Sequence, residues 1–514
     1  MFAFEDRFTP HFPADTATGR LPRMVQQALY AWVEPEPVSN PKLLLWSGET
    51  AALLGLPAEA AASHAVRDVL AGNAVVAGSR PYATVYGGHQ FGHWAGQLGD
   101  GRAISLGDIG THTLQLKGAG RTPFSRHADG RAVLRSSIRE FLCSEAMHHL
   151  GIPTTRALSL IGTDSTVERD MFYDGHPAQE PCALVCRVSP SFLRFGHFEL
   201  LAQREEIELL RRLADYTLTT HFPQIDPAAP DAIARMFDRI CRSTAELIAR
   251  WMAVGFVHGV MNTDNMSVLS ETIDYGPYGW LEKYDLQWTP NTTDAEGRRY
   301  SYGNQPAIAQ WNLSRLGNVL YPLIGDVTPL QDSLTAFNRE FHGHWNRLLA
   351  AKLGLTADVL QANPLCYQQL VHALSAMDMD FSLFFDALTR IAGKHEDCGS
   401  PESLQALLAC SYMEAPDPAP LQEWLKLYRM LLSESPMPER AAAMRAVNPV
   451  FTLRNHLVQD VIDAAHAGNL QPLQDIFLRL KTPYTDAAED ARWVRKCPPE
   501  SMHRAGCSML SCSS

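Results

Sequence analysis

The sequence lacks long hydrophobic runs and any excess of basic residues. No apolar run approaches the roughly 18 residues that a membrane-spanning helix needs, so we expect no membrane partner. The 44 lysines and arginines are outnumbered by 56 acidic residues, which gives a formal net charge of -12. Because nucleic-acid binders need a basic face for phosphate contacts, we expect no nucleic-acid partner either. Any anionic ligand must be met by a local concentration of positive charge.

Targeting signals and paired cysteines are also lacking. Glu5 and Asp6 follow Met1 closely, and no basic segment precedes an apolar one; the default expectation is a cytoplasmic protein. The ten cysteines show no Cys-x-x-Cys pair and no zinc-like spacing with histidine, so most are predicted to be buried. Cys507 and Cys512 lie in a small-residue segment that we expect to be unpacked, which makes them either redox candidates or part of an inert tail.

In this sequence, the segments with strand patterns precede most of the segments with helical patterns. Alternating patterns predict strands at 103–106, 113–117, 156–161 and 182–188, and a helical period predicts helices at 41–54 and 131–150. Helices dominate after residue 205, and the later ones are predicted at 205–216, 231–254, 306–354, 357–375, 380–393, 401–413, 419–434 and 450–481. We therefore predict an α+β, two-lobed protein-kinase-like fold with an added C-terminal helical region. The expected parts are an N-terminal extension (1–80), a nucleotide-binding lobe (81–200), a catalytic lobe (201–305), an accessory helical region (306–484) and a flexible tail (485–514).

The region around the first strands concentrates glycine and then arginine. A glycine-rich stretch runs from Tyr86 to Arg102; such a turn lets backbone N–H groups approach phosphate, although most glycine-rich loops are only turns. Between Lys117 and Glu140 only one acid interrupts a basic cluster that would suit a polyphosphate, or else a solvated face. Its arginines are Arg121, Arg126, Arg131, Arg135 and Arg139.

Four further residues fit phosphate binding by their positions. Lys117 ends a predicted strand and Glu140 lies within the next predicted helix, the order in which kinases place the phosphate-binding lysine and the glutamate that orients it. The alternative is two unrelated surface charges. Arg187 and Arg194 lie near the end of a later strand, where guanidinium groups can fork onto phosphate oxygens, although surface ion pairs explain most arginines.

The stretch from His258 to Gly276 carries the predicted chemistry. A carboxylate can accept the proton of an attacking hydroxyl, while an amide oxygen and a second carboxylate hold magnesium. These needs assign Asp264 as the base and Asn265 and Asp274 as metal ligands, with His258 at most orienting them. A lone Asp-Asn is more often a turn or a cap; the joint order of the glycine loop, lysine, glutamate, arginines and acids favours the catalytic interpretation.

Ordinary protein kinases differ from this chain in several motifs. The chain has no Gly-x-Gly-x-x-Gly-x-Val, His258 is followed by Gly-Val instead of Arg-Asp, Asp264 and Asn265 are adjacent, and no Ala-Pro-Glu closes an activation segment. We therefore do not expect simple protein kinase activity.

Four long motifs together resemble the selenoprotein O family of kinase-like protein adenylyltransferases. They are YGGHQFG at 86–92, LQLKGAGRTPFSR at 114–126, DGRAVLRSSIREF at 129–141 and HGVMNTDNMS at 258–267. The resemblance implies transfer of AMP from ATP to Ser, Thr or Tyr hydroxyls of protein substrates, with Mg²⁺ as cofactor and Mn²⁺ as the alternative. It also implies a nucleotide held inverted relative to kinases, and the surplus arginines would then meet a buried γ-phosphate.

Carried over by position, the resemblance implies a complete set of site residues. It puts the base at Asp264, the metal ligands at Asn265 and Asp274, and the lysine-orienting glutamate at Glu140. Cys512 aligns with the selenocysteine of some members. Two alternatives remain, a genuine protein kinase and a nucleotide-binding pseudokinase scaffold. The implied nucleotide contacts are Gly99, Gly101, Arg102, Lys117, Asp129, Gly130, Arg187 and Arg194.

Overall fold

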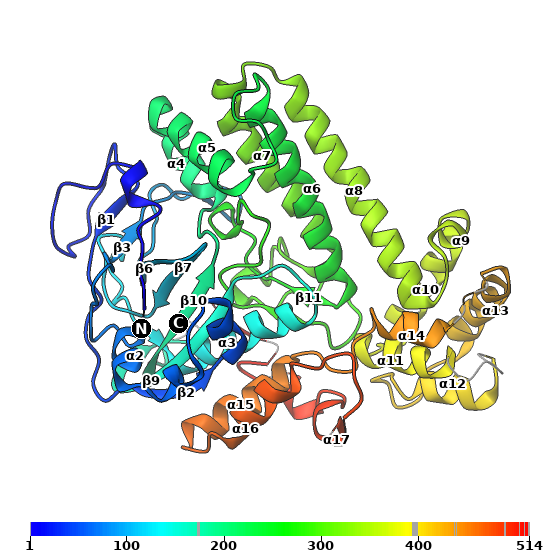
Figure 1. Ribbon diagram of the computed structural model, residues 1–514. Coiled ribbons are helices and arrows are strands. Elements are labelled where there is room, and N and C mark those ends of the chain that lie inside the picture. The colour runs from blue at the N-terminus through cyan, green and yellow to red at the C-terminus, as the bar shows by residue number, and fades with distance from the viewer. Residues whose placement is uncertain are drawn as a thin grey trace.

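The computed structural model in Figure 1 combines one antiparallel sheet with many helices. The sheet lies at one end, and long helices lead away from it. Among the described residues, no helix is both long and apolar enough to cross a membrane. The structure describes residues 2–171, 175–392, 399–435, 437, 439–487, 490–502, 504–507 and 509–511.

The main sheet has the strand order β1-β3-β6-β7-β10-β9-β2, with β8 pairing β10. Its neighbours pair antiparallel, and the central strands carry buried residues on both faces. The four strands predicted from alternation are confirmed as β6, β7, β9 and β10. The strand bounds are β1 Tyr30–Trp32, β2 Lys42–Trp46, β3 Tyr82–Thr84, β6 Ala103–Ile109, β7 His112–Lys117, β8 Ala132–Val133, β9 Arg156–Arg169 and β10 Ala178–Ser189.

Helix α3 (Leu134–His149) covers one face of this sheet and confirms the helix predicted at 131–150. Its apolar residues Ile138, Phe141 and Leu142 are fully buried. Because this side of the helix faces the sheet, Glu140 in the same turn is also held in the interior, at 3% exposure. The packing of α3 therefore brings a carboxylate to the edge of the strands.

The stretch from His258 to Tyr278 lies between the two strands of a short pair, β11 (Phe256–Val257) and β12 (Gly279–Trp280). The long helices α6 and α8 run side by side behind it. The helical pattern across 306–354 is broken into α7 and α8 at Gly325, whose φ of 77° ends α7 in a left-handed cap. The bounds are α4 Phe195–Gln203, α5 Ile207–His221, α6 Ala232–Ala253, α7 Gln305–Ile324 and α8 Thr328–Leu353.

The remaining helices form a separate group beyond α8, and the last of them return toward α3 (Figure 1). The helices predicted at 357–375, 380–393, 401–413, 419–434 and 450–481 are present, several of them divided or shortened. Their bounds are α9 Ala357–Ala362, α10 Pro364–Ala376, α11 Phe381–Ala392, α12 Pro401–Leu408, α13 Ala419–Glu434, α14 Arg440–Arg445, α15 Asn455–His466, α16 Gln471–Arg479 and α17 Asp490–Trp493.

Two expectations near the ends of the chain differ from the structure for the residues described. The helix predicted at 41–54 is confirmed only for α1 (Gly48–Leu53), because residues 42–46 form strand β2. The tail after residue 485 is packed: Trp493 and Cys507 are 4% and 3% exposed. The Asn455 side chain donates to the Cys507 carbonyl at 2.6 Å, which anchors this segment. Cys512 lies outside the described residues.

The prediction that most cysteines are buried is confirmed for the described residues. Eight of them are free thiols, and all eight are buried. Cys507 belongs to this group, so it is not a flexible terminal thiol. Its burial raises the pKa of the thiol to about 11, which disfavours the reactive thiolate form.

Lys352, on α8, is a buried cation held by neutral groups. Its ammonium donates to Asn448 Oδ1 at 2.8 Å and lies 4.0 Å from the ring centre of Phe385. Burial lowers the pKa of Lys352 to about 7. In the unfolded chain, Lys352 has the higher pKa of an ordinary lysine. Between pH 7 and that higher pKa, the folded protein therefore binds fewer protons than the unfolded chain, and its stability should rise with pH.

We expect Lys352→Met to stabilise the protein most near pH 7 and to lose this advantage as the pH rises. The difference in free energy of unfolding between variant and wild type should narrow by about 2 kcal/mol from pH 7 to pH 9, since one pKa unit corresponds to about 1.4 kcal/mol. Urea unfolding at both pH values measures it. The exposed Lys426→Met, on α13, is the control and should show no such change. An equal Lys352→Met effect on the free energy of unfolding at both pH values would show that burial does not lower the pKa of Lys352.

Candidate active site

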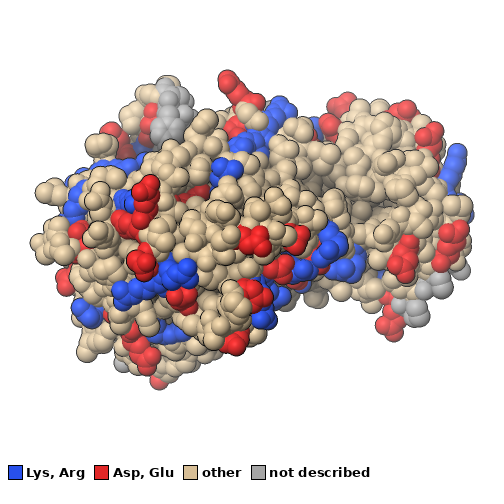
Figure 2. Space-filling model, turned by 90° about the horizontal axis from the view of Figure 1, so that it is seen from above, with Lys and Arg blue, Asp and Glu red and all other residues tan. Residues whose placement is uncertain are grey.

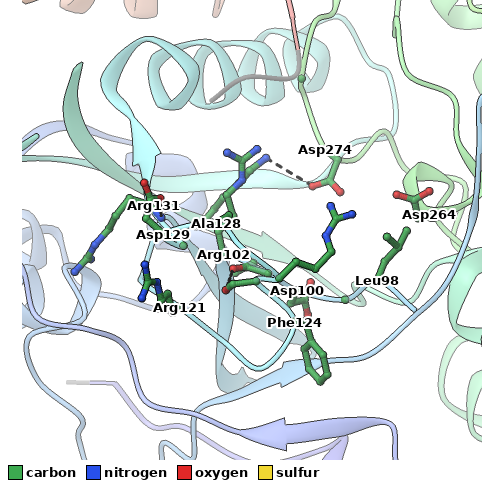
Figure 3. A pocket seen from close by; sticks show the side chains of 18 of the residues that line it. Leu98, Asp100, Arg102, Arg121, Phe124, Ala128, Asp129, Arg131, Asp264 and Asp274 are labelled. Carbon is green, nitrogen blue, oxygen red and sulfur yellow. Dashed lines mark hydrogen bonds and ion pairs between the residues drawn. The ribbon is translucent and has the colours of Figure 1, made fainter. Parts of the chain in front are cut away.

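A pocket of about 730 Å³ lies between the sheet and the 258–278 stretch. Figure 3 shows Asp264 and Asp274 on one side of it, and Arg121, Asp129 and Arg131 on the other. Every nucleotide, metal and base position predicted from sequence lines this pocket, and Glu140 lies directly behind Lys117. The lining residues from that prediction are Gly99, Gly101, Arg102, Lys117, Asp129, Gly130, Arg187, Arg194, Asp264, Asn265 and Asp274.

A buried ion cluster forms the floor of the pocket. Lys117 Nζ lies 2.7 Å from Glu140 Oε2 and 3.7 Å from Asp274 Oδ1. Arg187 Nη1 bonds to Glu140 Oε1 at 3.1 Å and to Asp274 Oδ1 at 2.5 Å. Arg194 Nη1 bonds to the other oxygen of Asp274. Two carboxylates and three cations from distant parts of the chain are therefore joined in one network.

Asp274 is held ionised and in a defined conformation. Burial alone would favour its neutral form, but Arg194, Arg187 and Lys117 hold the pKa of this carboxyl well below its usual range. Its φ of 54° is unusual for a residue other than glycine. His258 stabilises the preceding residue because its Nε2 lies 2.9 Å from the Ile273 carbonyl oxygen. The ring of His258 is stacked on Trp251, so this histidine can orient Asp274 without reaching the pocket.

Asp264 has a different environment, although it belongs to the same stretch. Burial raises the pKa of this carboxyl to about 7, while a hydrogen bond from Gln90 and the nearby Arg194 oppose the shift. Gln90 Nε2 donates to Asp264 Oδ2 at 3.1 Å, and Arg194 Nη1 donates to its backbone carbonyl at 2.9 Å. Asp264 Oδ1 is buried and has no hydrogen-bond partner among the residues that the structure describes. A group with such a pKa and one unused oxygen can exchange a proton near neutral pH.

The amide nitrogen of the neighbouring Asn265 is bound to the backbone. Its Nδ2 donates to the Val260 carbonyl at 2.9 Å. This bond fixes the orientation of the amide and leaves the Oδ1 oxygen for the pocket side, where Asn265 is a lining residue. An amide oxygen beside carboxylates is a donor set that hard divalent cations accept.

A small hairpin, β4 (His89–Gln90) with β5 (His93–Trp94), covers the Asp264 loop. His89 Nδ1 bonds to Glu199 Oε1 at 2.7 Å, and the His89 backbone N–H donates to Thr263 Oγ1 at 2.7 Å. Thr263 in turn donates to the second oxygen of Glu199. Sequence reasoning used this region as a glycine-rich stretch and as a family motif, but it missed Gln90 as a contact of Asp264, because no local pattern shows the pairing.

The glycine residues of the pocket are required by close packing. At Gly99, with a φ of 141°, a Cβ atom would lie 2.6 Å from the Phe124 ring and 2.9 Å from the Thr84 carbonyl. At Gly130, with a φ of 74°, it would lie 2.2 Å from the backbone of Gly120. Both loops are therefore compressed against a neighbouring chain segment, and their backbones stay close to the pocket.

Asp129, which lies between the two glycine-containing loops of the pocket, is bound by two arginine residues. Arg169 binds both of its oxygens, at 2.7 and 2.8 Å, and the Arg131 backbone N–H donates to it at 2.9 Å. Burial opposes ionisation, but the hydrogen bonds from Arg169 and Arg131 lower the pKa of Asp129. Arg169 also lines the pocket and was not among the predicted residues; it lies on β9, distant in sequence from the loop that it holds.

The arginine cluster predicted from sequence divides into two groups. Arg121, Arg126 and Arg131 line the pocket. Arg135 instead makes a bidentate ion pair with Glu180, at 2.7 and 3.1 Å. Arg139 is buried under the ring of Tyr278 and donates to its carbonyl at 2.6 Å. Helix α3 carries the last two away from the pocket.

Many basic side chains line the pocket. On the face drawn in Figure 2, basic and acidic side chains are interspersed.

The buried Asp100, 2% exposed, adds a further carboxylate at the pocket wall, 3.9 Å from Arg194. It accepts from the backbone N–H of Thr84 at 3.0 Å. This residue was also missed by sequence reasoning, since it lies among the glycines.

Comparisons with known proteins agree with this site. A family model described as "Protein adenylyltransferase SelO" matches residues 20–481. A protein nucleotidyltransferase YdiU from Nitrosospira multiformis is 48% identical, over 99% of this chain and 96% of its own length. Proteins of the same name from Rhodopirellula baltica and an Azoarcus species are 49% and 50% identical, over 99% of both chains.

The fold, the pocket and these relatives define an enzyme of the protein nucleotidyltransferase class. Within that class, the chain belongs to the SelO family of protein adenylyltransferases. The resemblance stated from the four sequence motifs is confirmed.

Loss of Glu140 should destabilise the protein through the ion cluster. Glu140→Ala leaves Lys117 without its closest carboxylate, and breaking a buried pair by removing one partner costs about 3 to 5 kcal/mol. Urea unfolding without nucleotide measures the change. The exposed Glu423→Ala, on α13, is the control and should stay within about 0.5 kcal/mol of wild type. A Glu140→Ala effect no larger than this control would show that the cluster contributes little to stability.

Proposed function

We propose that this enzyme transfers AMP from ATP to Ser, Thr or Tyr hydroxyls of proteins, with Asp264 as the general base. The single observation that carries the assignment is the Asp264 carboxylate, buried in a cation-rich pocket with one oxygen that no other described residue binds. A buried carboxylate with a pKa of about 7 can accept a hydroxyl proton near neutral pH. Its position beside Arg194 places that proton transfer next to the positive charge that a phosphate needs.

In the proposed reaction the acceptor hydroxyl oxygen attacks the α-phosphorus of ATP. The new oxygen–phosphorus bond forms while the bond from the α-phosphorus to the bridging oxygen breaks, and pyrophosphate leaves with that electron pair. Asp264 Oδ1 takes the hydroxyl proton. The Gln90 amide keeps the other oxygen, Oδ2, in place at 3.1 Å, so that the free oxygen is the one presented to the acceptor.

A divalent metal ion belongs to this proposal, with Mg²⁺ preferred and Mn²⁺ as the alternative. Asn265 and Asp274 would hold it, and the bound ion would neutralise phosphate charge. The donors fit in kind: the Asn265 amide is oriented by its bond to Val260, and Asp274 is ionised. Because Arg187 and Arg194 already bind Asp274, the ion would share this carboxylate with them.

The nucleotide would occupy the space between the two glycine-containing loops. Gly99, Gly101 and Gly130 keep their backbones close to it, and Arg102 and Asp129 lie at the same wall. Lys117, Arg187 and Arg194 supply cations for the phosphates. The inverted pose implied by the family would direct the γ-phosphate into this wall and the α-phosphate toward Asp264.

We further propose that residues 81–200 and 201–305 act as the two lobes of a kinase-like fold, with the pocket between them. The position of the pocket between the sheet and the 258–278 stretch supports this division. Residues 306–484 would then be an accessory helical region. The 1–80 segment would extend the first lobe, to whose sheet β1 and β2 belong. The described residues of 485–514, such as Trp493 and Cys507, would form a terminal segment packed on the rest.

Label from α-labelled ATP should appear on protein, and label from γ-labelled ATP should not. Asp264→Ala should lower the α-label transfer by about 100-fold or more, since general bases contribute factors of that order. Autoradiography of purified protein with candidate substrate proteins measures both labels. The exposed Asp332→Ala, on α8, is the control and should retain full transfer.

The two alternatives give different outcomes in the same assay. Transfer of the γ-label in place of the α-label would establish a protein kinase. Thermal stabilisation by ATP without transfer of either label would establish a nucleotide-binding scaffold. Equal α-label transfer by wild type and Asp264→Ala would remove Asp264 as the base.

Gly88→Ala should impair transfer by displacing the base. A Cβ atom at Gly88 would lie 2.6 Å from Asp264 Oδ1, and displacing a reacting group by about 1 Å can cost about 100-fold in rate. Gly48→Ala is the matched control because a Cβ atom there meets nothing within 4 Å. The measurement is the initial rate of α-label transfer. Wild-type activity of Gly88→Ala would show that the Asp264 loop tolerates displacement.

A further inference from the structure

A second pocket, of about 390 Å³, lies where the C-terminal segment packs against α15 and the residues after β12. Its lining includes Glu282, His456, Cys497 and Cys507. None of these residues lines the nucleotide pocket. The proposed transfer reaction therefore leaves this group of carboxylate, imidazole and thiol side chains unexplained.

The ligand atoms of Glu282, His456 and Cys497 converge. One such atom from each residue lies within 4.8 Å of the other two. His456 and Cys497 are 1% and 4% exposed. His456 Nδ1 lies 2.9 Å from Glu282 Oε1, somewhat closer than the roughly 3.3 Å between two ligands bound at about 2.0 to 2.1 Å to a tetrahedral ion. A small separation of the two side chains would admit a metal ion.

The other ring nitrogen of His456, Nε2, is buried and has no hydrogen-bond partner among the described residues. Buried polar atoms of this kind are rare, because leaving one unsatisfied costs about 1 to 3 kcal/mol. Nδ1, which lies beside Glu282 Oε1, is the nitrogen that would bind the ion, and Nε2 would then carry the ring proton.

The Glu282 carboxylate is held in a fixed orientation. Arg454 binds Glu282 Oε2 at 3.1 Å and also binds Asp380, which is fully buried. Two carboxylates therefore share one guanidinium group. The nearby Lys283 is paired with Asp378 at 2.8 Å. Because Arg454 holds Oε2, the other oxygen of Glu282 faces His456 in a fixed orientation, as supporting residues do for metal-binding carboxylates.

We propose that Glu282, His456 and Cys497 bind a thiophilic divalent transition-metal ion, with zinc as the probe. A carboxylate, an imidazole and a thiolate form a ligand set that zinc accepts, and the pocket provides water for the fourth position. Binding replaces the Cys497 S–H bond by a sulfur–metal bond and releases the proton to solvent. The ion would join the C-terminal segment to α15 and to the chain after β12.

The other candidate metal group in the described structure does not match this chemistry. It consists of Glu49, His148 and His149, and it contains no sulfur. Glu49 is also paired with Lys481 at 3.3 Å. Only the site at Cys497 would therefore place a thiolate on the metal, and this difference separates the two sites spectroscopically.

Cobalt titration of the full-length, reduced protein in excess Mg²⁺ tests the proposal. Cobalt should bind in one equivalent and give a thiolate-to-cobalt charge-transfer band that zinc abolishes by displacement. The nucleotide pocket cannot give this band, because none of its lining residues is a cysteine. Cys497→Ser should abolish the band, and His456→Gln should weaken cobalt binding about tenfold or more, the usual scale for losing a group at a metal site.

Two matched variants and two further readouts complete the test. Cys507→Ser, in the same pocket, and Cys366→Ser, buried on α10, should keep the band. Titration of free thiols in denaturant confirms reduction, and unchanged α-label transfer confirms that Cys497→Ser and His456→Gln are folded. No thiolate band in the reduced wild type, or an unchanged band in Cys497→Ser, would overturn the proposal whether or not the protein transfers AMP.

Discussion

The ion cluster around Asp274 is the constraint on which the rest of the site depends. Its cations come from the end of β7, from β10 and from the N-terminus of α4, and its second carboxylate comes from α3. Removing such charges from water costs several kcal/mol per ion, which only a matched arrangement of opposite charges offsets. Sheet, helix and the 258–278 stretch must therefore meet in one relative position. Other packings would leave a buried charge unpaired.

Two aspartates of that stretch show how environment divides their chemistry. Three cations hold the pKa of Asp274 well below its usual range. Asp264 is buried with one hydrogen bond to an amide and one oxygen that no other described residue binds, and its pKa rises to about 7. Carboxyls whose environments shift their pKa values in opposite directions commonly take different roles. In the proposed mechanism the ionised group binds metal and the other exchanges protons.

Sequence patterns predicted the local elements well and their ends less well. Alternation located β6, β7, β9 and β10 because each of these strands lies between two others in the sheet and buries its own apolar side chains. The same reasoning took 41–54 as helical, although pairing with β9 draws Lys42–Trp46 into a strand. It also took the last residues as loose, since a segment rich in small residues gives no local sign of the partners, such as Asn455, that bind it.

By itself, the sequence determined the order of the elements, the family, and the residue types that meet in the pocket. Long sequence motifs carry these features because each feature depends on residues that are close together in the chain. Only the tertiary structure decided which polar groups meet. Arg135 and Arg139 bind elsewhere, while Gln90, Asp100 and Arg169 line the pocket. The physical reason is that hydrogen bonds and ion pairs act over a few ångströms in space, between residues far apart in the chain.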